Sequence, residues 1–340
     1  MKALVTGSNG FIAGYLVAEL LENGWDVVGV DNFSKYGRVS KSYDKHPKYK
    51  LVEGDAKDVE LLKKLIGDCD HFVVCAAMIG GISYFHKYAY DLIAENERIT
   101  GAAFDAAIWA HKNKKLVKAT LLSSSMVYEC STKFPTPEGA QLSSPPPLST
   151  YGFQKLATEY YAKGAWEQYQ LPYTIVRPFN CVGIGEGRAQ GEHEVYSGNV
   201  KLAMSHVVPD LVQKILKGQD PLHILGDGNQ VRHYTYGGDL AHGIRLAMES
   251  EKALNEDFNI STALSTTVRE LAEVIWRKVH GPERPLRLVS DPPYEHDVQM
   301  RVPDVRKARE VLGFEATTSL DEMLDEVIPW IRDEIEAGRI

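Results

Sequence analysis

Short apolar runs that alternate with segments of helical periodicity constrain the fold of this chain more than any other feature. Apolar residues recur at helical spacing in the intervening segments, such as Phe11–Glu22, Leu92–His111 and Gln154–Tyr169. The alternation predicts an α/β fold, a doubly wound parallel sheet with helices on both faces. The expected strands are Ala3–Val5, Val27–Val30, Leu51–Glu53, Phe72–Cys75, Ala119–Ser123 and Tyr173–Arg177.

The pattern changes after about residue 180. The loop from Gly183 to Gly198 is rich in glycine and charge, and shorter pieces follow it. We predict a first domain over residues 1–180, joined by residues 227–257, and a smaller C-terminal lobe mainly over 181–340. The later elements expected are His223–Leu225 with Asp239–Met248, Phe258–Ile260 with Val268–Val279, and an amphipathic helix over Ser319–Glu336.

Composition excludes several classes of protein. The 340 residues are 44% hydrophobic, enough for a full core, and the net charge of −8 comes without any basic run that would suit nucleic acid. No stretch of about 18 apolar residues suggests a membrane span. The N-terminus opens directly on a strand pattern without a signal peptide, so we expect a cytoplasmic protein.

The cysteines and histidines give no metal signature. Cys69, Cys75, Cys130 and Cys181 lack CxxC spacing and are expected to be reduced packing residues. The stretch His193–His206 holds two histidines and one glutamate, but their spacing matches no zinc site, so no metal is predicted.

A glycine-containing turn joins the first strand to the first helix in TGSNGFIAG. Gly7 and Gly10 would let backbone N–H groups approach a pyrophosphate at the helix N-terminus. An ordinary strand-to-helix turn can contain the same glycines. The evidence for a dinucleotide site therefore depends also on the acidic residues farther along the chain. Asp31 ends the second strand, where an acid binds the ribose hydroxyls and repels a 2′-phosphate. Asp55, after the third strand, is placed to contact adenine. Together these residues predict a Rossmann-type domain that binds NAD rather than NADP.

Tyr151 and Lys155 lie four residues apart in YGFQK, on one face of a predicted helix. A phenol has a pKa near ~10, and a neighbouring ammonium and a cationic nicotinamide would both favour the phenolate. Tyr151 could then act as a general base. The same spacing also occurs on ordinary helix surfaces, and the preceding strand decides between these interpretations.

That strand ends in LLSSSMVYE, which places Ser124 where ligands bind open α/β sheets. Its hydroxyl could share a hydrogen bond with Tyr151 and a substrate oxygen, although a serine there could simply cap the next element. Asn96, in the preceding helix, is a candidate cofactor contact, with helix packing as its alternative role.

These motifs together resemble the extended short-chain dehydrogenase/reductases of the NAD-dependent nucleotide-sugar epimerase/dehydratase family. The resemblance runs from TGSNGFI to KAREVLGF and includes RPFN at 177–180 and GDGNQVRHY at 226–234. It implies a catalytic set of Ser124, Tyr151 and Lys155 and a nucleoside-diphosphate sugar as substrate. The implied cofactor contacts are Gly7, Gly10, Phe11, Ile12, Asp31, Asn32, Asp55, Ala56, Ala76 and Ala77, and the implied substrate contacts include Asn180, Arg232 and His206.

Three departures from the family pattern refine this expectation. Family dehydratases carry an Asp-Glu pair after the catalytic hydroxyl, where this chain has Ser125 and Met126, which we expect to line the substrate site. Gly80-Gly81 resembles fucose synthases and 3,5-epimerases, but the cysteine of the latter is replaced here by Met126. The family's Arg-x-Gly-Asp is replaced by Tyr294-Glu295-His296-Asp297, so His296 becomes the candidate second phosphate ligand.

The leading hypothesis is an NAD-dependent epimerase of a nucleoside-diphosphate sugar, acting at C4 through a transient 4-keto intermediate. Arg188, in the glycine-rich loop, is a further candidate for the sugar or a carboxylate on it, or else a solvated charge. Dehydration or 3,5-epimerisation from the same intermediate is the alternative within the enzyme class. A catalytically silent NAD-binding protein is the alternative outside it. A homodimer through the helices over Leu92–His111 and Gln154–Tyr169 is implied by the resemblance.

Overall fold

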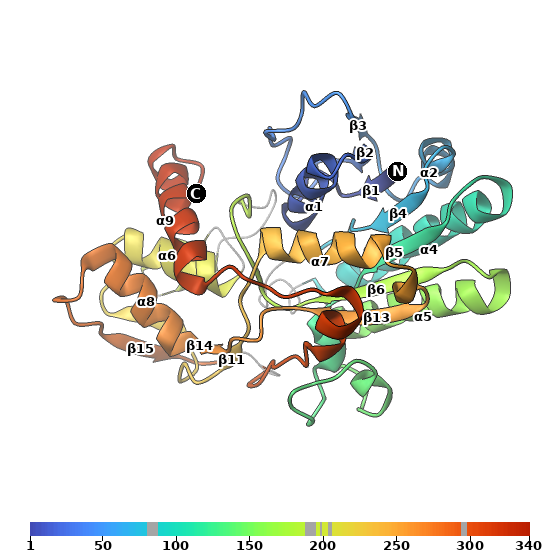
Figure 1. Cartoon of the computed structure of the whole chain (residues 1–340). Coiled ribbons are helices and arrows are strands. Elements are labelled where there is room, and N and C mark those ends of the chain that lie inside the picture. Colours follow the sequence, from blue (N-terminus) through green and yellow to red (C-terminus); the bar gives the residue numbers. More distant parts are fainter. Residues whose placement is uncertain (80–87, 188–194, 198, 203–205, 294–297) are drawn as a thin grey trace.

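A computed structural model describes residues 1–79, 88–187, 195–197, 199–202, 206–293 and 298–340. Seven of its strands form one sheet in the order β13-β6-β5-β4-β1-β2-β3, and all are parallel (Figure 1). The strands are β1 (Lys2–Thr6), β2 (Asp26–Asp31), β3 (Tyr49–Glu53), β4 (His71–Val74), β5 (Lys118–Leu122), β6 (Tyr173–Pro178) and β13 (Glu256–Ile260).

Helices cover both faces of this sheet, as the sequence predicted. One core joins α1 (Phe11–Glu22) and α7 (Gly237–Glu249) to the sheet. The other joins α2 (Val59–Ile66), α4 (Ala89–Asn113) and α5 (Thr150–Tyr169). Every strand from β4 to β6 is almost wholly buried, because each lies between two helical layers. The Rossmann-type architecture is therefore confirmed.

A third hydrophobic core lies in the lobe on the left of Figure 1. Helices α6 (Val207–Leu216), α8 (Val268–His280) and α9 (Leu320–Glu336) enclose it with the parallel pair β10 (Leu222–Leu225) and β15 (Leu288–Asp291). Short pairs complete the chain: β7 (Cys181–Val182) with β12 (Thr235–Tyr236), β8 (Val195–Ser197) with β9 (Val200–Leu202), and β11 (Val231–Arg232) with β14 (Thr266–Thr267).

The chain crosses between these two parts more than once. β10 belongs to the left-hand lobe, yet the helix after it, α7, packs on α1. β13 then closes the main sheet beside β6, and α8 returns to the lobe. β13 reaches Ile260, three residues beyond the segment 227–257 that we expected to join the sheet domain. No helix among the described residues is long and apolar enough to cross a membrane.

Candidate active site

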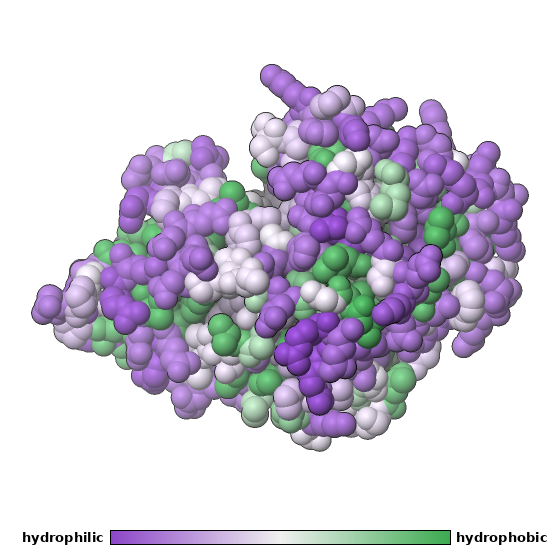
Figure 2. All heavy atoms as spheres, in the orientation of Figure 1, coloured by the Kyte–Doolittle hydropathy of each residue, from purple (hydrophilic) through white to green (hydrophobic). Residues whose placement is uncertain are grey.

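A cavity of about 780 Å³ opens at the carboxyl ends of the central strands, between the sheet and the lobe. The strand order reverses between β1 and β4, the position at which open α/β sheets bind ligands. The molecular surface in Figure 2 is correspondingly hollowed between α9 and the loop that leads to β3. Residues of both parts line the cavity, so a ligand bound there contacts both.

The turn before α1 forms one end of the cavity. Gly7 has a φ of +68°, and a Cβ atom on it would lie 2.9 Å from the Cα of Ala76, so only glycine fits. Gly10 is the N-cap of α1, and no side chain caps this helix. The first N–H groups of α1, including those of Phe11 and Ile12 in the cavity wall, therefore meet an anion without competition from a capping side chain.

Asp31 lies beside this turn at the end of β2. Its carboxylate accepts hydrogen bonds from the backbone N–H groups of Asn9 at 2.9 Å and Phe33 at 2.8 Å, which fix its orientation. Asn32 and Asp55 meet across the same end of the cavity, with 3.5 Å between Nδ2 and Oδ2. Ala56 also lines the wall, so all four predicted adenosine contacts come together.

Ala76 and Ala77 line the cavity where predicted, after β4. Asn96 is not among the residues that line it, so its contact with the cofactor stays a prediction. Its side-chain amide instead makes two hydrogen bonds with the backbone of Met78, accepting from the N–H at 2.7 Å and donating to the C=O at 2.9 Å. Asn96 therefore fixes the backbone position of Met78, which lines the cavity.

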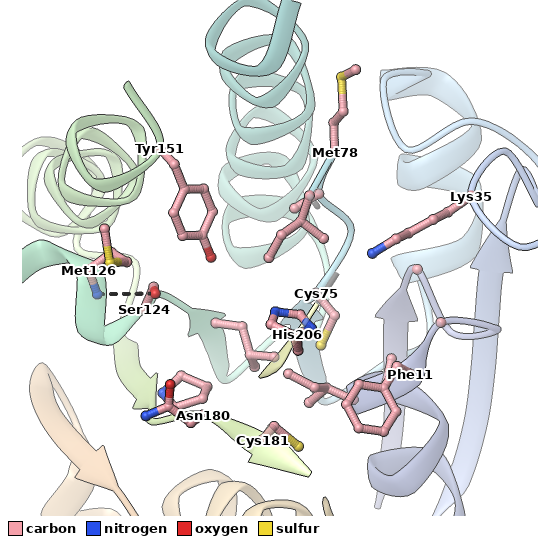
Figure 3. Close-up of a pocket in the computed structure, with 18 of the residues that line it drawn as sticks. Phe11, Lys35, Cys75, Met78, Ser124, Met126, Tyr151, Asn180, Cys181 and His206 are labelled. Atoms are coloured by element: carbon pink, nitrogen blue, oxygen red, sulfur yellow. Dashed lines mark hydrogen bonds between the residues drawn. The ribbon is translucent and has the colours of Figure 1, made fainter. Parts of the chain in front are cut away.

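Ser124 lies two residues beyond β5, and its hydroxyl makes two contacts. Its hydroxyl accepts from the N–H of Met126 at 3.2 Å and so caps the 3₁₀ helix η1 (Ser125–Tyr128). It also makes a side-chain hydrogen bond with Tyr151. Figure 3 shows the Tyr151 ring extending into the cavity toward Ser124, opposite Phe11 and Lys35.

Tyr151 and Lys155 lie on the buried face of α5, and only 5% and 8% of their surfaces are exposed. Burial raises the pKa of Tyr151, and the Ser124 hydrogen bond and the charge of Arg301 oppose that rise. We had expected Lys155 to be the group that lowers this pKa. Lys155 is itself so buried that its pKa falls to about 8, and its Nζ donates to the C=O of Leu122 at 3.1 Å. Its amine therefore loses its proton more readily than that of an exposed lysine.

Five of the predicted substrate residues line the cavity, namely Ser125, Met126, Asn180, His206 and Arg232. Asn180 has a φ of +36°, and its buried Nδ2 has no hydrogen-bond partner among the described residues. Arg232 donates to the C=O of Val231 at 2.9 Å and is 9% exposed. His206 is paired with the buried Glu186. Arg188, His296 and the Gly80-Gly81 pair lie outside the described residues.

Three residues in the cavity wall were not predicted from the sequence. Arg301 Nη2 lies 2.9 Å from Sδ of Met126. The Tyr234 hydroxyl is buried without a hydrogen-bond partner among the described residues. Glu129 accepts from Ser149 at 3.1 Å (N–H) and 2.7 Å (hydroxyl), and Ser149 caps α5, so this carboxylate anchors the start of the catalytic helix. Only the resemblance to relatives could have marked these positions, because no local pattern surrounds them.

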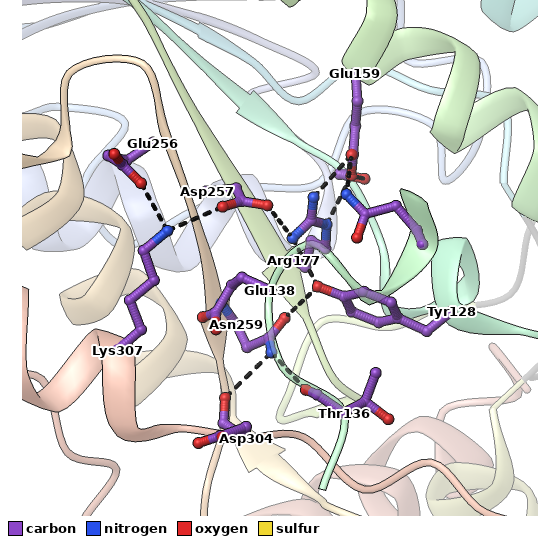
Figure 4. A network of polar contacts seen from close by, with 12 residues as sticks. Tyr128, Thr136, Glu138, Glu159, Arg177, Glu256, Asp257, Asn259, Asp304 and Lys307 are labelled. Carbon is purple, nitrogen blue, oxygen red and sulfur yellow. Dashed lines mark hydrogen bonds and ion pairs between the residues drawn. The ribbon is translucent and has the colours of Figure 1, made fainter. Parts of the chain in front are cut away.

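A buried polar network surrounds Arg177 (Figure 4). Arg177 of the RPFN motif makes a two-pronged ion pair with Glu159 of α5, at 2.7 and 2.8 Å, and both side chains are fully buried. The same guanidinium reaches Asp257 of β13 at 2.6 Å and the Tyr128 hydroxyl at 2.6 Å. The network therefore ties α5, β6, β13 and η1 together.

Several known proteins are similar to this chain along nearly its whole length. The UDP-glucose 4-epimerase of Lactobacillus helveticus is 28% identical over 343 residues, covering 96% of this chain and 95% of the relative. The structure of a UDP-glucose 4-epimerase from Thermotoga maritima with UDP-glucose superposes with a TM-score of 0.79 at 29% identity, covering 98% of this chain and 100% of that one.

A UDP-glucuronic acid 4-epimerase from Bacillus cereus, solved with UDP-glucuronic acid and NAD, has a TM-score of 0.81 at 25% identity and covers 98% and 99% of the two chains. The family model of NAD-dependent epimerases and dehydratases matches residues 3–261. This protein therefore belongs to the NAD-dependent epimerase/dehydratase family and is an NAD-dependent enzyme.

Proposed function

We propose that the protein inverts C4 of a nucleoside-diphosphate sugar, with a uridine nucleotide as the first candidate because the relatives described above act on or bind UDP-sugars. One observation carries the choice of epimerisation. Ser124, Tyr151 and Lys155 come together in the cavity, while Ser125 and Met126 occupy the positions of the acid–base pair that elimination of water requires.

The residues around the glycine turn fit NAD. The uncapped N-terminus of α1 would hold the pyrophosphate, Asp31 the adenosine ribose, and the backbone after β4 would contact the nicotinamide half. When bound, NAD accepts a hydride from C4 and returns it. Tyr151 takes the proton of the C4 hydroxyl, and Ser124 holds the same oxygen by a hydrogen bond.

The substrate side of the cavity must allow the 4-keto sugar to turn over before its reduction. Arg232 and Asn180 would hold the diphosphate, since a guanidinium fork and an unpartnered amide suit phosphate oxygens. A cavity of about 780 Å³ lies in the range usual for ligand sites and leaves the sugar room to rotate about its phosphate link. Tyr151 then returns the proton to the oxygen on the inverted carbon.

We further propose that the protein forms a homodimer and is located in the cytoplasm. Helices α4 and α5 lie side by side, and α5 exposes Tyr160 and Tyr161, which suits a homodimer through this pair. Analytical ultracentrifugation of the wild type and of Tyr160→Glu tests that interface. The four cysteines are free, which fits the reducing cytoplasm.

The deciding experiment is incubation with a panel of nucleotide sugars, followed by product NMR and mass spectrometry. An inverted C4 at unchanged mass is the expected result. Loss of one water would replace the proposal with dehydration, and inversion at C3 and C5 would replace it with 3,5-epimerisation. The absence of turnover with every sugar, in a protein that binds NAD, would favour the silent binding protein.

A further inference from the structure

Two oppositely charged side chains lie one helical turn apart on α6, in the wall that the lobe contributes to the cavity. Nζ of Lys214 is 3.2 Å from Oδ2 of Asp210, and the two side chains are 3% and 17% exposed. The same ammonium donates to the C=O of His223 in β10 at 3.1 Å. The pair is therefore held between a helix and a strand, and its position is fixed before a ligand enters.

The wall around this pair is apolar. Val208, Leu211 and Ile224 line the cavity, and all three belong to the buried core of the lobe. A few polar groups in an apolar wall fix the orientation of a bound ligand. Holding two charges away from water also costs free energy, which a ligand that forms hydrogen bonds with both groups would offset. The pair therefore has the surroundings that ligand recognition requires.

The part of a nucleotide sugar that reaches α6 is the base. Helix α6 and strand β10 belong to the lobe, whereas the glycine turn precedes α1 on the main sheet (Figure 1). With the sugar at Tyr151 and the diphosphate at Arg232, the nucleoside extends away from the sheet and into the lobe. The base would then lie against Asp210 and Lys214.

The two charged groups offer opposite hydrogen-bonding roles side by side. The Lys214 ammonium has three N–H donors, and the described residues supply two acceptors for it, Asp210 and the C=O of His223. Burial raises the pKa of the Asp210 carboxyl to about 6 and Lys214 opposes that rise, so this group is largely ionised at neutral pH. Its buried Oδ1 has no hydrogen-bond partner among the described residues. A ligand that donates to Asp210 and accepts from Lys214 would satisfy both groups.

Nucleobases differ in the order of donor and acceptor on the edge farthest from the ribose. Uracil, thymine and guanine have an exocyclic C=O beside a ring N–H, whereas cytosine and adenine have an exocyclic amine beside a ring nitrogen that accepts. Lys214 is the more deeply buried of the two residues, so it would meet the exocyclic group, which extends farthest from the ribose. An amine there would set donor against donor at Lys214 and acceptor against acceptor at Asp210.

We propose that Asp210 and Lys214 recognise the base of the substrate and select uracil, thymine or guanine over cytosine or adenine. This inference rests on the proposed function, because it takes the ligand to be a nucleotide sugar. It adds the two residues that contact the base and the classes of base that they exclude.

Binding of free nucleotides tests the inference without any turnover. Calorimetric titration of the NAD-saturated protein compares UDP with CDP and GDP with ADP, and the pair that binds more tightly decides. Its carbonyl member should bind about 10- to 100-fold more tightly than its amine member, the effect of a mismatched hydrogen bond to a charged group. Equal affinities, or a preference for the amine member, would overturn the inference.

Lys214→Met removes the ammonium and should bring the two affinities to within about threefold of each other, while kcat with saturating sugar stays near the wild-type value. Because this variant leaves a buried carboxylate without its cation, the neutral variant Asp210→Asn/Lys214→Met is measured beside it. Lys278→Met, which breaks an ion pair with the exposed Asp325 outside the cavity wall, is the matched control and should keep the wild-type ratio. An unchanged ratio in the neutral double variant would show that the pair does not select the base.

Turnover separates this inference from the proposed function. Selectivity that depends on Asp210 and Lys214, in a protein that epimerises no nucleotide sugar, would overturn the proposed function and leave the base subsite standing. Epimerisation with equal kcat/KM for the same sugar on both bases of the pair would overturn the base subsite alone.

Discussion

The hydroxyl of Ser123 donates a 2.6 Å hydrogen bond to Oε1 of Glu159, and both side chains are buried. Ser123 directly precedes Ser124 at the end of β5, and Glu159 lies one helical turn after Lys155 on α5. This single bond therefore connects the strand end that carries Ser124 to the helix that carries Tyr151 and Lys155.

Ser123→Ala should lower kcat by about tenfold while leaving KM for the sugar and the stability of the fold nearly unchanged. Glu159 keeps its ion pair with Arg177, so no buried charge loses its partner. Steady-state kinetics with thermal unfolding checks this. Thr174→Val, which removes a buried 2.6 Å bond from the neighbouring strand β6 to Ala253, is the control and should leave kcat intact. Wild-type kcat in Ser123→Ala would show that the bond positions nothing.

Arg177→Met should destabilise the protein by about 3–5 kcal/mol, because it leaves the buried Glu159 without its cation and weakens the hold on Asp257. Urea unfolding followed by circular dichroism measures the loss. Arg287→Met breaks an ion pair with Asp220 in which the arginine side chain is 66% exposed, and should cost at most about 1 kcal/mol. Similar losses in the two variants would contradict the structural importance of the buried pair.

Local patterns were sufficient to predict the main strands and helices and the residues that meet around the glycine turn. The helix over Phe11–Glu22 has the bounds that its periodicity indicated. Gly7 and Asp31 lie beside each other because Gly7 directly follows β1, Asp31 ends β2, and these two strands are paired. The meeting of Ser124, Tyr151 and Lys155 was predictable because a helix fixes the spacing of Tyr151 and Lys155 and a strand end fixes the place of Ser124.

The sugar end of the site was less predictable, because its residues meet only through tertiary packing. Arg301 and Met126 are 175 positions apart, and no periodicity indicates their contact. Burial raises the pKa of Tyr151 and lowers that of Lys155, and the sequence does not reveal how deeply either side chain is buried. The two bonds of Asn96 to the Met78 backbone were not predictable either, because they depend on a loop conformation that the sequence does not reveal.

Asp31→Asn should weaken NAD binding by about tenfold and narrow the preference for NAD over NADP. The amide keeps one acceptor for the N–H groups of Asn9 and Phe33 but loses the charge that repels a 2′-phosphate. Calorimetric titration of both cofactors into the cofactor-free protein measures the two affinities. Asp26→Asn, at the opposite end of β2, is the control. An unchanged ratio of the affinities for NAD and NADP would show that Asp31 does not select between the two cofactors.

Tyr151→Phe should retain NAD and the nucleotide sugar but lose turnover, because the phenolic oxygen is the group that exchanges the C4 proton. Bound NAD is measured by its absorbance after release from the denatured protein, and turnover by product NMR. Phe153→Leu, on the exposed side of the same helix, should keep full activity. Full activity in Tyr151→Phe would refute the general-base role.

Ser124→Ala should shift the acidic limb of the kcat–pH profile to higher pH. The hydrogen bond from Ser124 lowers the pKa of Tyr151, so its removal raises that pKa further above the ordinary value. At a given pH less phenolate is then present, so kcat is lower than in the wild type. This difference in kcat is largest at acidic pH and shrinks as the pH rises through the new pKa. Ser131→Ala, a buried serine outside the cavity wall, should leave the profile unmoved. A loss of the same size at every pH would mean that Ser124 only orients the sugar and does not tune the base.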